Sequence, residues 1–398
     1  MSPRSQIQYA KIGVLSLAHM LNDLYSNYLP QLFPFLVVLS PGFTATRATI
    51  MVSAFTFTSS MVQPLFGYFL DRKGKRWLVH VGTLWMAVML SLTGWVDNYW
   101  LMVLLAALAG LGTAAFHPQA STMVNVLSGD YKAVMLSFFV AFGNVGFALG
   151  PLLLVPLFEA YGLKATAVTV IPGVFVAVLL YFFAPSNTDL SGSVPELSAV
   201  IRSLKASTRE LTAIIGVIAI RSLSYSGMLA IMPLYFKSQH LSNIAASHLL
   251  TIMLFAGAVG GLMGGFLSDY YGRKQLVVGS LVMSTPLFFV FFYTHGAWSM
   301  LFLALAGAAL LSSFSVTVVA AQEAIPDNKA LAAGLTMGFA GGIGGLAVIL
   351  IGRVGDRWGL EAAIFILFLL PLIAGLVGLL MQDRPAARLQ RQEAASGS

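Results

Sequence analysis

Polar residues interrupt an apolar stretch close to the N-terminus, "SLAHMLNDLYSNYLP" at residues 16–30. His19 and Asp23 are four residues apart, so a helix places both side chains on one face, with Asn22 beside them. An imidazole and a carboxylate in this arrangement can take up and release protons near neutral pH. Inside a membrane a carboxylate is costly and usually marks a pathway. We therefore interpret Asp23 and His19 as candidates for proton coupling.

Further polar side chains lie within other apolar stretches. Arg221 is a base inside one of them, and a guanidinium pairs with carboxylate or phosphonate oxygens through two parallel hydrogen bonds. His117, before Pro118 in "FHPQAS", is a candidate to bind substrate or relay protons, or it hydrogen-bonds a neighbour. Glu323 in "AQEAIP" fits a substrate exit, an inner gate or a water-exposed helix end. The substrate-binding candidates are Arg221, Asn22, Tyr25, His117, Asn144 and Glu323.

The composition predicts that these residues lie in a membrane protein. Of the 398 residues 58% are hydrophobic and 9% are charged, against about 25% charged in soluble domains. Apolar runs of about 18 residues or more predict membrane-spanning helices, and a barrel would need alternating polarity. Twelve runs qualify, so we expect an all-α membrane protein: 11–37, 47–69, 77–95, 99–126, 132–157, 164–184, 210–236, 245–268, 276–293, 297–321, 330–352 and 360–381.

The net charge of +7 is explained by membrane topology and does not indicate a nucleic-acid partner. With the N-terminus inside, 16 Lys and Arg residues fall on the inner side and 5 on the outer side, while Arg221 lies within a helix. This excess places both termini in the cytoplasm. We expect a multi-pass protein of the bacterial inner membrane, surrounded by lipid and monomeric.

The chain also repeats itself. "GYFLDRKGKR" (67–76) and "GFLSDYYGRK" (265–274) align at an offset of 198, and the same shift carries Gly143 and Gly146 onto Gly341 and Gly344. A repeat of about half the length predicts two parallel six-helix halves. The expected parts are a bundle at 1–184, a polar cytoplasmic linker at 185–209, a second bundle at 210–384 and a cytoplasmic tail at 385–398.

The repeat gives a geometric hypothesis for the membrane charges. Asp23 plus 198 is Arg221, and Asp23 stands about 18 Å above Lys11 on a helix, close to the middle of a bilayer. An acid and a base would then face each other at matching depth. Protonation of Asp23 would release Arg221 to hold an anionic substrate. A static ion pair between the two halves is the structural alternative.

Other kinds of chemistry find no support. The glycine-rich "GNVGFALGP" (143–151) and "GGIGG" (341–345) lack the Gly-x-x-x-x-Gly-Lys-Ser/Thr pattern of a phosphate loop, and small residues at this spacing let membrane helices pack closely. Zero cysteines exclude disulfides and thiolate metal sites. We expect no cofactor, no resident metal and no enzymatic activity.

The architecture and the repeated loop resemble the major facilitator superfamily, with its substrate site between two parallel halves. The resemblance covers essentially the whole chain and implies that the loop latches the halves in an outward-open state. Asp71 at a helix C-terminus also needs a positive partner, because the helix dipole disfavours an anion there. The expected gating residues are Gly67, Asp71, Arg72, Gly74, Arg76, Gly265, Asp269, Gly272 and Arg273.

Shorter strings, "HMLND" (19–23), "FHP" (116–118) and "AQEAIP" (321–326), together with 143–151, resemble the fosmidomycin-resistance branch of bacterial efflux proteins. That resemblance implies proton-driven export of small polar or anionic compounds such as phosphonate antibiotics. Helix 99–126 lacks the Arg that many drug/proton antiporters carry there, which puts more weight on Asp23.

Three other functions fit the same residues less well. A proton-coupled importer of a small metabolite would share the fold and the site. A transporter of a metal or metal chelate would use His19, Asp23 and His117 as ligands, since imidazole and carboxylate suit divalent transition metals. A membrane scaffold would need neither Asp23 nor Arg221 within the membrane.

Overall fold

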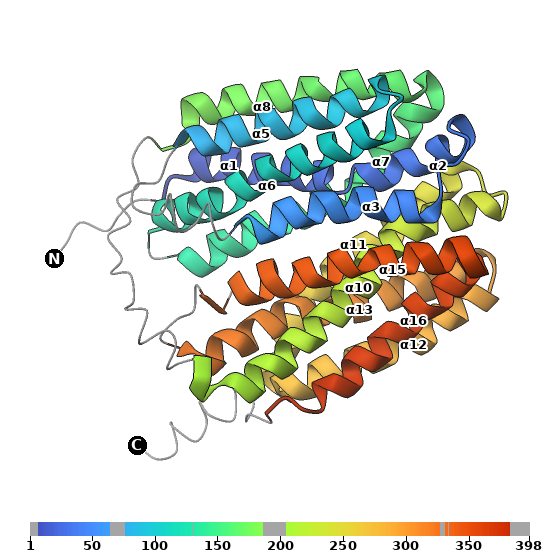
Figure 1. Ribbon diagram of the computed structural model, residues 1–398. Helices are drawn as coiled ribbons and strands as arrows, with labels where there is room; N and C mark the ends of the chain where they lie inside the picture. The colour runs from blue at the N-terminus through green and yellow to red at the C-terminus, as the bar shows by residue number, and fades with distance from the viewer. Residues whose placement is uncertain are drawn as a thin grey trace, which may run out of the picture. The chain divides into compact units, whose positions relative to one another are not determined.

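The regular structure of the described residues is helical (Figure 1). The computed structural model describes residues 7–63, 76–129, 131–185, 204–326, 331–332 and 334–382. The chain divides into two compact units, Met1–Gly192 with Pro233–Thr251, and Ser193–Met232 with Ile252–Ser398.

The elements before residue 186 are α1 (Tyr9–Ser26), α2 (Leu29–Leu39), α3 (Ala45–Thr56), the π-helical turn η1 (Phe57–Met61), α5 (Arg76–Ser91), the 3₁₀ turn η2 (Leu92–Trp95), α6 (Tyr99–Leu127), α7 (Lys132–Tyr161), the 3₁₀ segment η3 (Leu163–Thr169) and α8 (Val170–Phe183). Those after residue 203 are α10 (Thr208–Ser238), α11 (Asn243–Tyr271), α12 (Arg273–Tyr293), α13 (Gly296–Ala324), the π-helical η5 (Gly334–Ala340), α15 (Gly341–Trp358) and α16 (Leu360–Gly378).

Ten helices of the described part are long and apolar enough to cross a membrane, and they coincide with the last ten predicted spans. The first predicted span, 11–37, is divided between α1 and α2. The second, 47–69, begins in α3 and η1, and its end lies outside the described residues. The all-helical membrane fold is thus confirmed, while the count of twelve helices in two six-helix halves stays a prediction.

Proline explains why α1 and α2 separate. Pro30 has no backbone N–H to donate to the carbonyl four residues earlier, and its ring clashes with that carbonyl, so the helix that starts at Leu29 does not continue the preceding one. Side chains cover the polar groups at the break. The Asn27 amide donates to the Phe147 carbonyl at 2.9 Å, and the Gln31 amide donates to the Asn27 carbonyl at 3.1 Å. The break is therefore anchored to α7.

In the first unit, α1 packs against α5, α6, α7 and α8 (Figure 1). The backbone N–H of Gln8 donates to the Leu127 carbonyl at 3.2 Å, so the start of α1 lies beside the end of α6 and the two helices run antiparallel. A glycine lets α7 come close to α1, because a Cβ on Gly146 would lie 1.8 Å from the Met20 carbonyl oxygen. Helix α1 thus contacts four helices of its own unit.

In the second unit, α12 packs against α13 and α16, and α15 packs against α16. Helix α10 joins them through the Ser224 hydroxyl, which donates to the Leu367 carbonyl at 2.7 Å. Gly344 of α15 repeats the close approach made by Gly146, since its Cβ would lie 2.4 Å from the Ala219 carbonyl oxygen of α10. Both units therefore use a glycine at the same place in the repeat.

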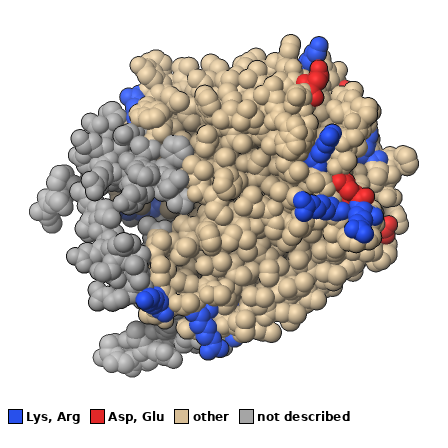
Figure 2. All heavy atoms as spheres, in the orientation of Figure 1, with Lys and Arg blue, Asp and Glu red and all other residues tan. Residues whose placement is uncertain are grey.

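The surface matches an apolar surrounding. On the face shown in Figure 2, most of the described surface carries neither basic nor acidic side chains. All six Trp side chains of the chain are exposed, by 41% to 67%. Trp at the molecular surface is typical of proteins that contact the lipid–water interface.

Candidate functional site

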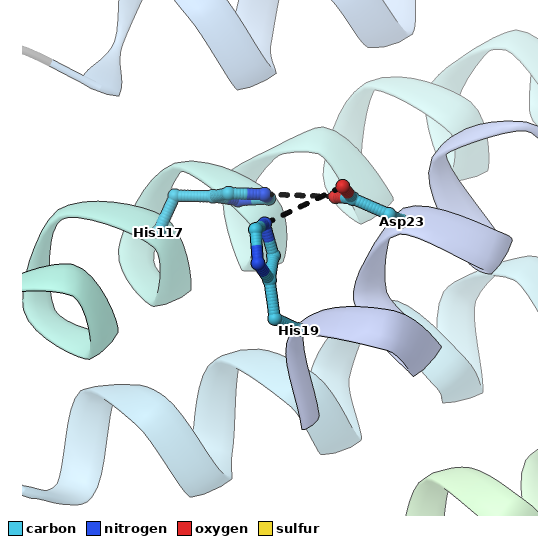
Figure 3. Close-up of side chains that lie close together, drawn as sticks. All are labelled: His19, Asp23 and His117. Carbon is cyan, nitrogen blue, oxygen red and sulfur yellow. Dashed lines mark hydrogen bonds and ion pairs between the residues drawn. The ribbon is translucent and has the colours of Figure 1, made fainter. Parts of the chain in front are cut away.

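The first unit brings two histidines and a carboxylate together (Figure 3). His19 and Asp23 share a face of α1, as their spacing predicts, and the His19 Nε2 lies 3.4 Å from the Asp23 Oδ2. Helix α6 supplies His117, whose Nε2 lies 2.9 Å from the Asp23 Oδ1. The three side chains are 8%, 17% and 24% exposed, for His19, Asp23 and His117. We refer to them below as the His–Asp–His cluster.

The backbone fixes both imidazole rings. The His19 Nδ1 donates to the Phe139 carbonyl at 2.8 Å, and the His117 Nδ1 donates to the Thr113 carbonyl at 3.1 Å. The His19 ring also stacks on the Phe139 ring, with centroids 4.1 Å apart and planes 16° from parallel. Each ring therefore turns its Nε2 toward Asp23.

Helix α7 packs directly against the His–Asp–His cluster. A Cβ on Gly143 would lie 2.5 Å from the Asp23 Oδ2 and 2.7 Å from the His19 Nε2, closer than real Cβ contacts allow. Only glycine leaves room at this position for the carboxylate and the imidazole together.

The neighbouring predicted site residues hold α1 in place. The Asn22 amide is buried and donates to the Thr83 hydroxyl at 2.9 Å, which links α1 to α5. The buried Tyr25 hydroxyl donates to the Thr169 carbonyl of η3. Asn144 follows Gly143 on α7 and is half-buried. Substrate binding by these three residues stays a prediction.

Arg221 lies in the second unit, in α10, and is only 3% exposed. Its guanidinium carbon lies 4.8 Å above the centroid of the Phe314 ring of α13. Among the described residues its Nε has no hydrogen-bond partner. A buried guanidinium with an unpaired donor is a strong candidate to bind an anion, because an unsatisfied buried donor costs about 1–3 kcal/mol.

The second copy of the loop motif forms a polar cluster in the second unit. Arg273, at the start of α12, donates to the Asp269 carboxylate at 2.6 Å and lies 3.3 Å from the Glu323 carboxylate of α13. Gly272 joins α11 to α12 with a φ of +93°, which favours glycine. Glu323, predicted to bind substrate, is thus paired with a residue predicted to act in gating.

The first copy of the motif is described only at its end. Gly67, Asp71, Arg72 and Gly74 lie outside the described residues. Arg76 begins α5, and its guanidinium lies 5.4 Å from the centroid of the Tyr181 ring of α8. Gating by the first motif stays a prediction.

Several contacts were not foreseen from the sequence. Phe139 and Thr113 act through backbone carbonyls, and Phe314 through its ring, so none of them carries a polar signal in the sequence. Gly143 did carry a signal, since glycines at 143, 146 and 150 predicted close helix packing. That signal did not indicate that the neighbour would be Asp23.

The sequence is similar to those of known bacterial transporters. The chain is 30% identical over 393 residues to the fosmidomycin resistance protein of Escherichia coli K12, covering 96% of this chain and 95% of that one. It is also 30% identical over 386 residues to the MFS-type transporter YfnC of Bacillus subtilis 168, covering 94% of each chain. The multidrug resistance protein MdtG of Salmonella paratyphi A is 27% identical over 272 residues, covering 65% of this chain and 67% of that one.

Solved transporters share the fold at low sequence identity. A bacterial homologue of the human lysosomal transporter Spinster superposes with a TM-score of 0.74 at 13% identity, covering 99% of this chain and 98% of that one. The nucleoside transporter NupG superposes with a TM-score of 0.73 at 14% identity, covering 93% of this chain and 98% of that one.

The model of the Major Facilitator Superfamily matches residues 15–330 and 214–397. With ten apolar helices of spanning length in the described part, the chain is a multi-pass membrane transporter and not an enzyme. It belongs to the major facilitator superfamily and is similar to its fosmidomycin-resistance branch.

Proposed function

We propose that this protein is a proton-driven exporter of a small polar or anionic compound and works by alternating access. The names of two relatives, a fosmidomycin resistance protein and a multidrug resistance protein, support efflux. The observation that carries proton coupling is the position of Asp23 in α1, in contact with two imidazoles. Ionisable groups inside membrane segments usually mark an ion or substrate pathway.

Arg221 supports an anionic substrate. A buried guanidinium that keeps an unpaired donor can form charge-assisted hydrogen bonds to a phosphonate or carboxylate. Protonation of Asp23 removes one negative charge from the first half of the transporter. The sequence-based hypothesis is that this change frees Arg221 for the anion.

The test uses purified protein in liposomes, with the phosphonate fosmidomycin as the probe. An imposed pH gradient should drive fosmidomycin accumulation by the unaltered protein. Asp23→Asn should abolish gradient-driven accumulation and leave fosmidomycin exchange, because exchange needs no net proton movement. Arg221→Gln should reduce both, because the anion site itself is lost. Gradient-driven accumulation by Asp23→Asn would remove Asp23 as the coupling residue.

Proton-coupled import of a small metabolite is the first alternative, since the same site can work in the opposite direction. The sign of the gradient decides between them. Export predicts that fosmidomycin moves against the proton flow, whereas import predicts movement with it.

Transport of a metal or metal chelate is the second alternative, and one observation favours it. One donor atom each from His19, Asp23 and His117 lie within 4.8 Å of one another. Tetrahedral ligands at about 2.0–2.1 Å from a zinc ion stand about 3.3 Å apart. The 2.9 Å contact between His117 and Asp23 is shorter, and it suits a shared proton better. Uptake of zinc that competes with fosmidomycin would favour the metal function.

The remaining topology is part of the same proposal. We infer a monomer of the bacterial inner membrane, with bundles at 1–184 and 210–384, a linker at 185–209 and a tail at 385–398, the linker, tail and both termini being cytoplasmic. The excess of Lys and Arg on one side supports this orientation.

A further inference from the structure

The hydrogen bonds of the His–Asp–His cluster determine where its protons can be. A backbone carbonyl oxygen can only accept a hydrogen bond, so the Nδ1 atoms of His19 and His117 both carry a hydrogen. A neutral imidazole has a single N–H. The Nε2 of each ring is therefore protonated only when the ring is a cation.

This constraint makes the contact between His117 and Asp23 informative. An ionised carboxylate and a neutral Nε2 are both acceptors, and two acceptors do not form a hydrogen bond. A 2.9 Å separation between the His117 Nε2 and the Asp23 Oδ1 therefore requires one proton between them. The pair is neutral when it holds that proton, on whichever atom, and carries one negative charge after losing it.

Resting on the proposed function, we infer that Asp23 and His117 carry the coupling proton jointly and that His19 is a positioning residue. Release breaks the bond from this proton to Nε2 or Oδ1 and transfers it to water on the side to which the pair opens; uptake reverses this. The assignment moves proton coupling from His19, where the sequence suggested it, to His117, for which proton relay was one of the predicted roles.

The surroundings distinguish the two histidines. His19 is clamped by the Phe139 carbonyl, by stacking on the Phe139 ring and by the close wall at Gly143, and its Nε2 is 3.4 Å from Asp23. His117 is closer to Asp23 and three times more exposed, at 24% against 8%. A group that exchanges protons with water needs that access.

The described residues of α5 and α7 against the cluster add no further titratable side chain. Helix α7 faces Asp23 with Gly143 and holds His19 with Phe139, neither of which titrates, and α5 meets the neighbouring Asn22 with Thr83. Among the described residues, Asp23 forms ion pairs with the two histidines alone. The protonation of these three side chains therefore decides the local charge.

The direct test is nitrogen NMR of protein labelled at its six histidine rings, which needs no substrate. At high pH the His117 and His19 signals should have the shifts of the Nδ1–H tautomer. Asp23→Asn should change the ring-nitrogen shifts of His117 at a given pH, because the carboxylate that shares the proton is removed, and leave those of exposed His248 unchanged. An Nε2–H tautomer at His117 at high pH, or His117 shifts that do not respond to Asp23→Asn, would overturn the inference.

The second test substitutes amides that mimic one ring nitrogen at a time, with fosmidomycin in liposomes as the probe. Asn places an N–H where Nδ1 lies, and Gln places one where Nε2 lies. His117→Asn and His117→Gln should both lose gradient-driven accumulation at least tenfold and keep exchange, because an amide neither takes up nor releases a proton in this pH range. His19→Asn should recover most of the activity that His19→Gln loses, because only Asn can donate to the Phe139 carbonyl.

Each outcome is decisive. Gradient-driven accumulation by His117→Gln would overturn joint proton carriage, and equal losses in the two His19 variants would overturn positioning through Nδ1. His248→Gln is the matched control and should leave accumulation unchanged. If the unaltered protein does not move fosmidomycin, the proposed function fails for this compound, while the NMR experiment still tests the shared proton.

Discussion

At the scale of residues, the space beside Gly143 decides whether the His–Asp–His cluster can exist. Its α-carbon faces both the Asp23 carboxylate and the His19 imidazole, and a methyl group there would lie 2.5 Å from one and 2.7 Å from the other. Side chains that share a proton need their separation held to a few tenths of an ångström. A change on α7 therefore acts on groups that belong to α1.

Gly143→Ala should reduce pH-driven transport in liposomes by about 10- to 100-fold, as misplaced reacting groups commonly do. Exchange should fall much less, since the proposed anion site at Arg221 in α10 is unchanged. Gly13→Ala on α1 is the matched control, because nothing lies within 4 Å of its added Cβ. Normal pH-driven transport by Gly143→Ala would show that the cluster tolerates displacement.

The sequence predicts part of this site. Spacing alone places His19 and Asp23 on one face of a helix. The contact of His117 with Asp23 depends on how α6 packs against α1, since the two residues are 94 apart in the chain. The spacing of residues within one helix gives no information on that packing. The hydrogen bonds to the Phe139 and Thr113 carbonyls could not be predicted from the sequence either, because every residue type has a backbone carbonyl.

At the scale of elements, glycine controls the approach of α7 to α1 and of α15 to α10. Gly146 and Gly344 each face a backbone carbonyl oxygen, of Met20 and of Ala219. A backbone oxygen cannot move aside as a flexible side chain can. Adding a methyl group must therefore push the two helices apart.

Gly146→Ala and Gly344→Ala should each destabilise the protein by about 1–3 kcal/mol, the usual cost of overpacking. Thermal unfolding in detergent, followed by circular dichroism, measures the effect. Gly279→Ala should be neutral or slightly stabilising, since its Cβ would contact nothing within 4 Å and alanine favours helix. Unchanged unfolding of both variants would mean that the helices adjust freely.

The same contacts show why element boundaries and registers were only partly predictable. Hydropathy predicted ten of the spans, but membrane helices often tolerate proline, so Pro30 did not signal the break between α1 and α2. The two glycines are 198 residues apart, whereas Met20 and Ala219 are 199 apart. In this contact α10 and α1 are therefore related by an offset of 199 residues, one more than the offset of 198 that aligned Asp23 with Arg221.

At the scale of the whole molecule, a hydrogen bond within the first unit joins segments from the two halves of the sequence. The Asn243 amide, at the start of α11, donates to the Glu159 carboxylate at the end of α7 at 2.6 Å. The proposed alternating access would move the first six predicted spans against the last six. This contact must then break and re-form in each transport cycle.

The chain has no cysteine, so an engineered pair can be cross-linked selectively. Glu159→Cys with Asn243→Cys, joined by a short reducible bifunctional thiol reagent, should arrest fosmidomycin transport, and reduction should restore it. Trp95→Cys with Lys164→Cys is the control, because both sites lie in the first half, where Trp95 donates to the Lys164 carbonyl. Full transport by the cross-linked 159–243 pair would contradict the required separation.

The exposure of all six tryptophans determines what the protein's intrinsic fluorescence reports. The emission comes from indole rings at the molecular surface and not from the His–Asp–His cluster. Brominated phospholipids should quench most of it, whereas saturating fosmidomycin should change it little. A fluorescence signal that reports substrate binding at Arg221 therefore requires an introduced tryptophan, for example Phe314→Trp, which places an indole beside the Arg221 guanidinium.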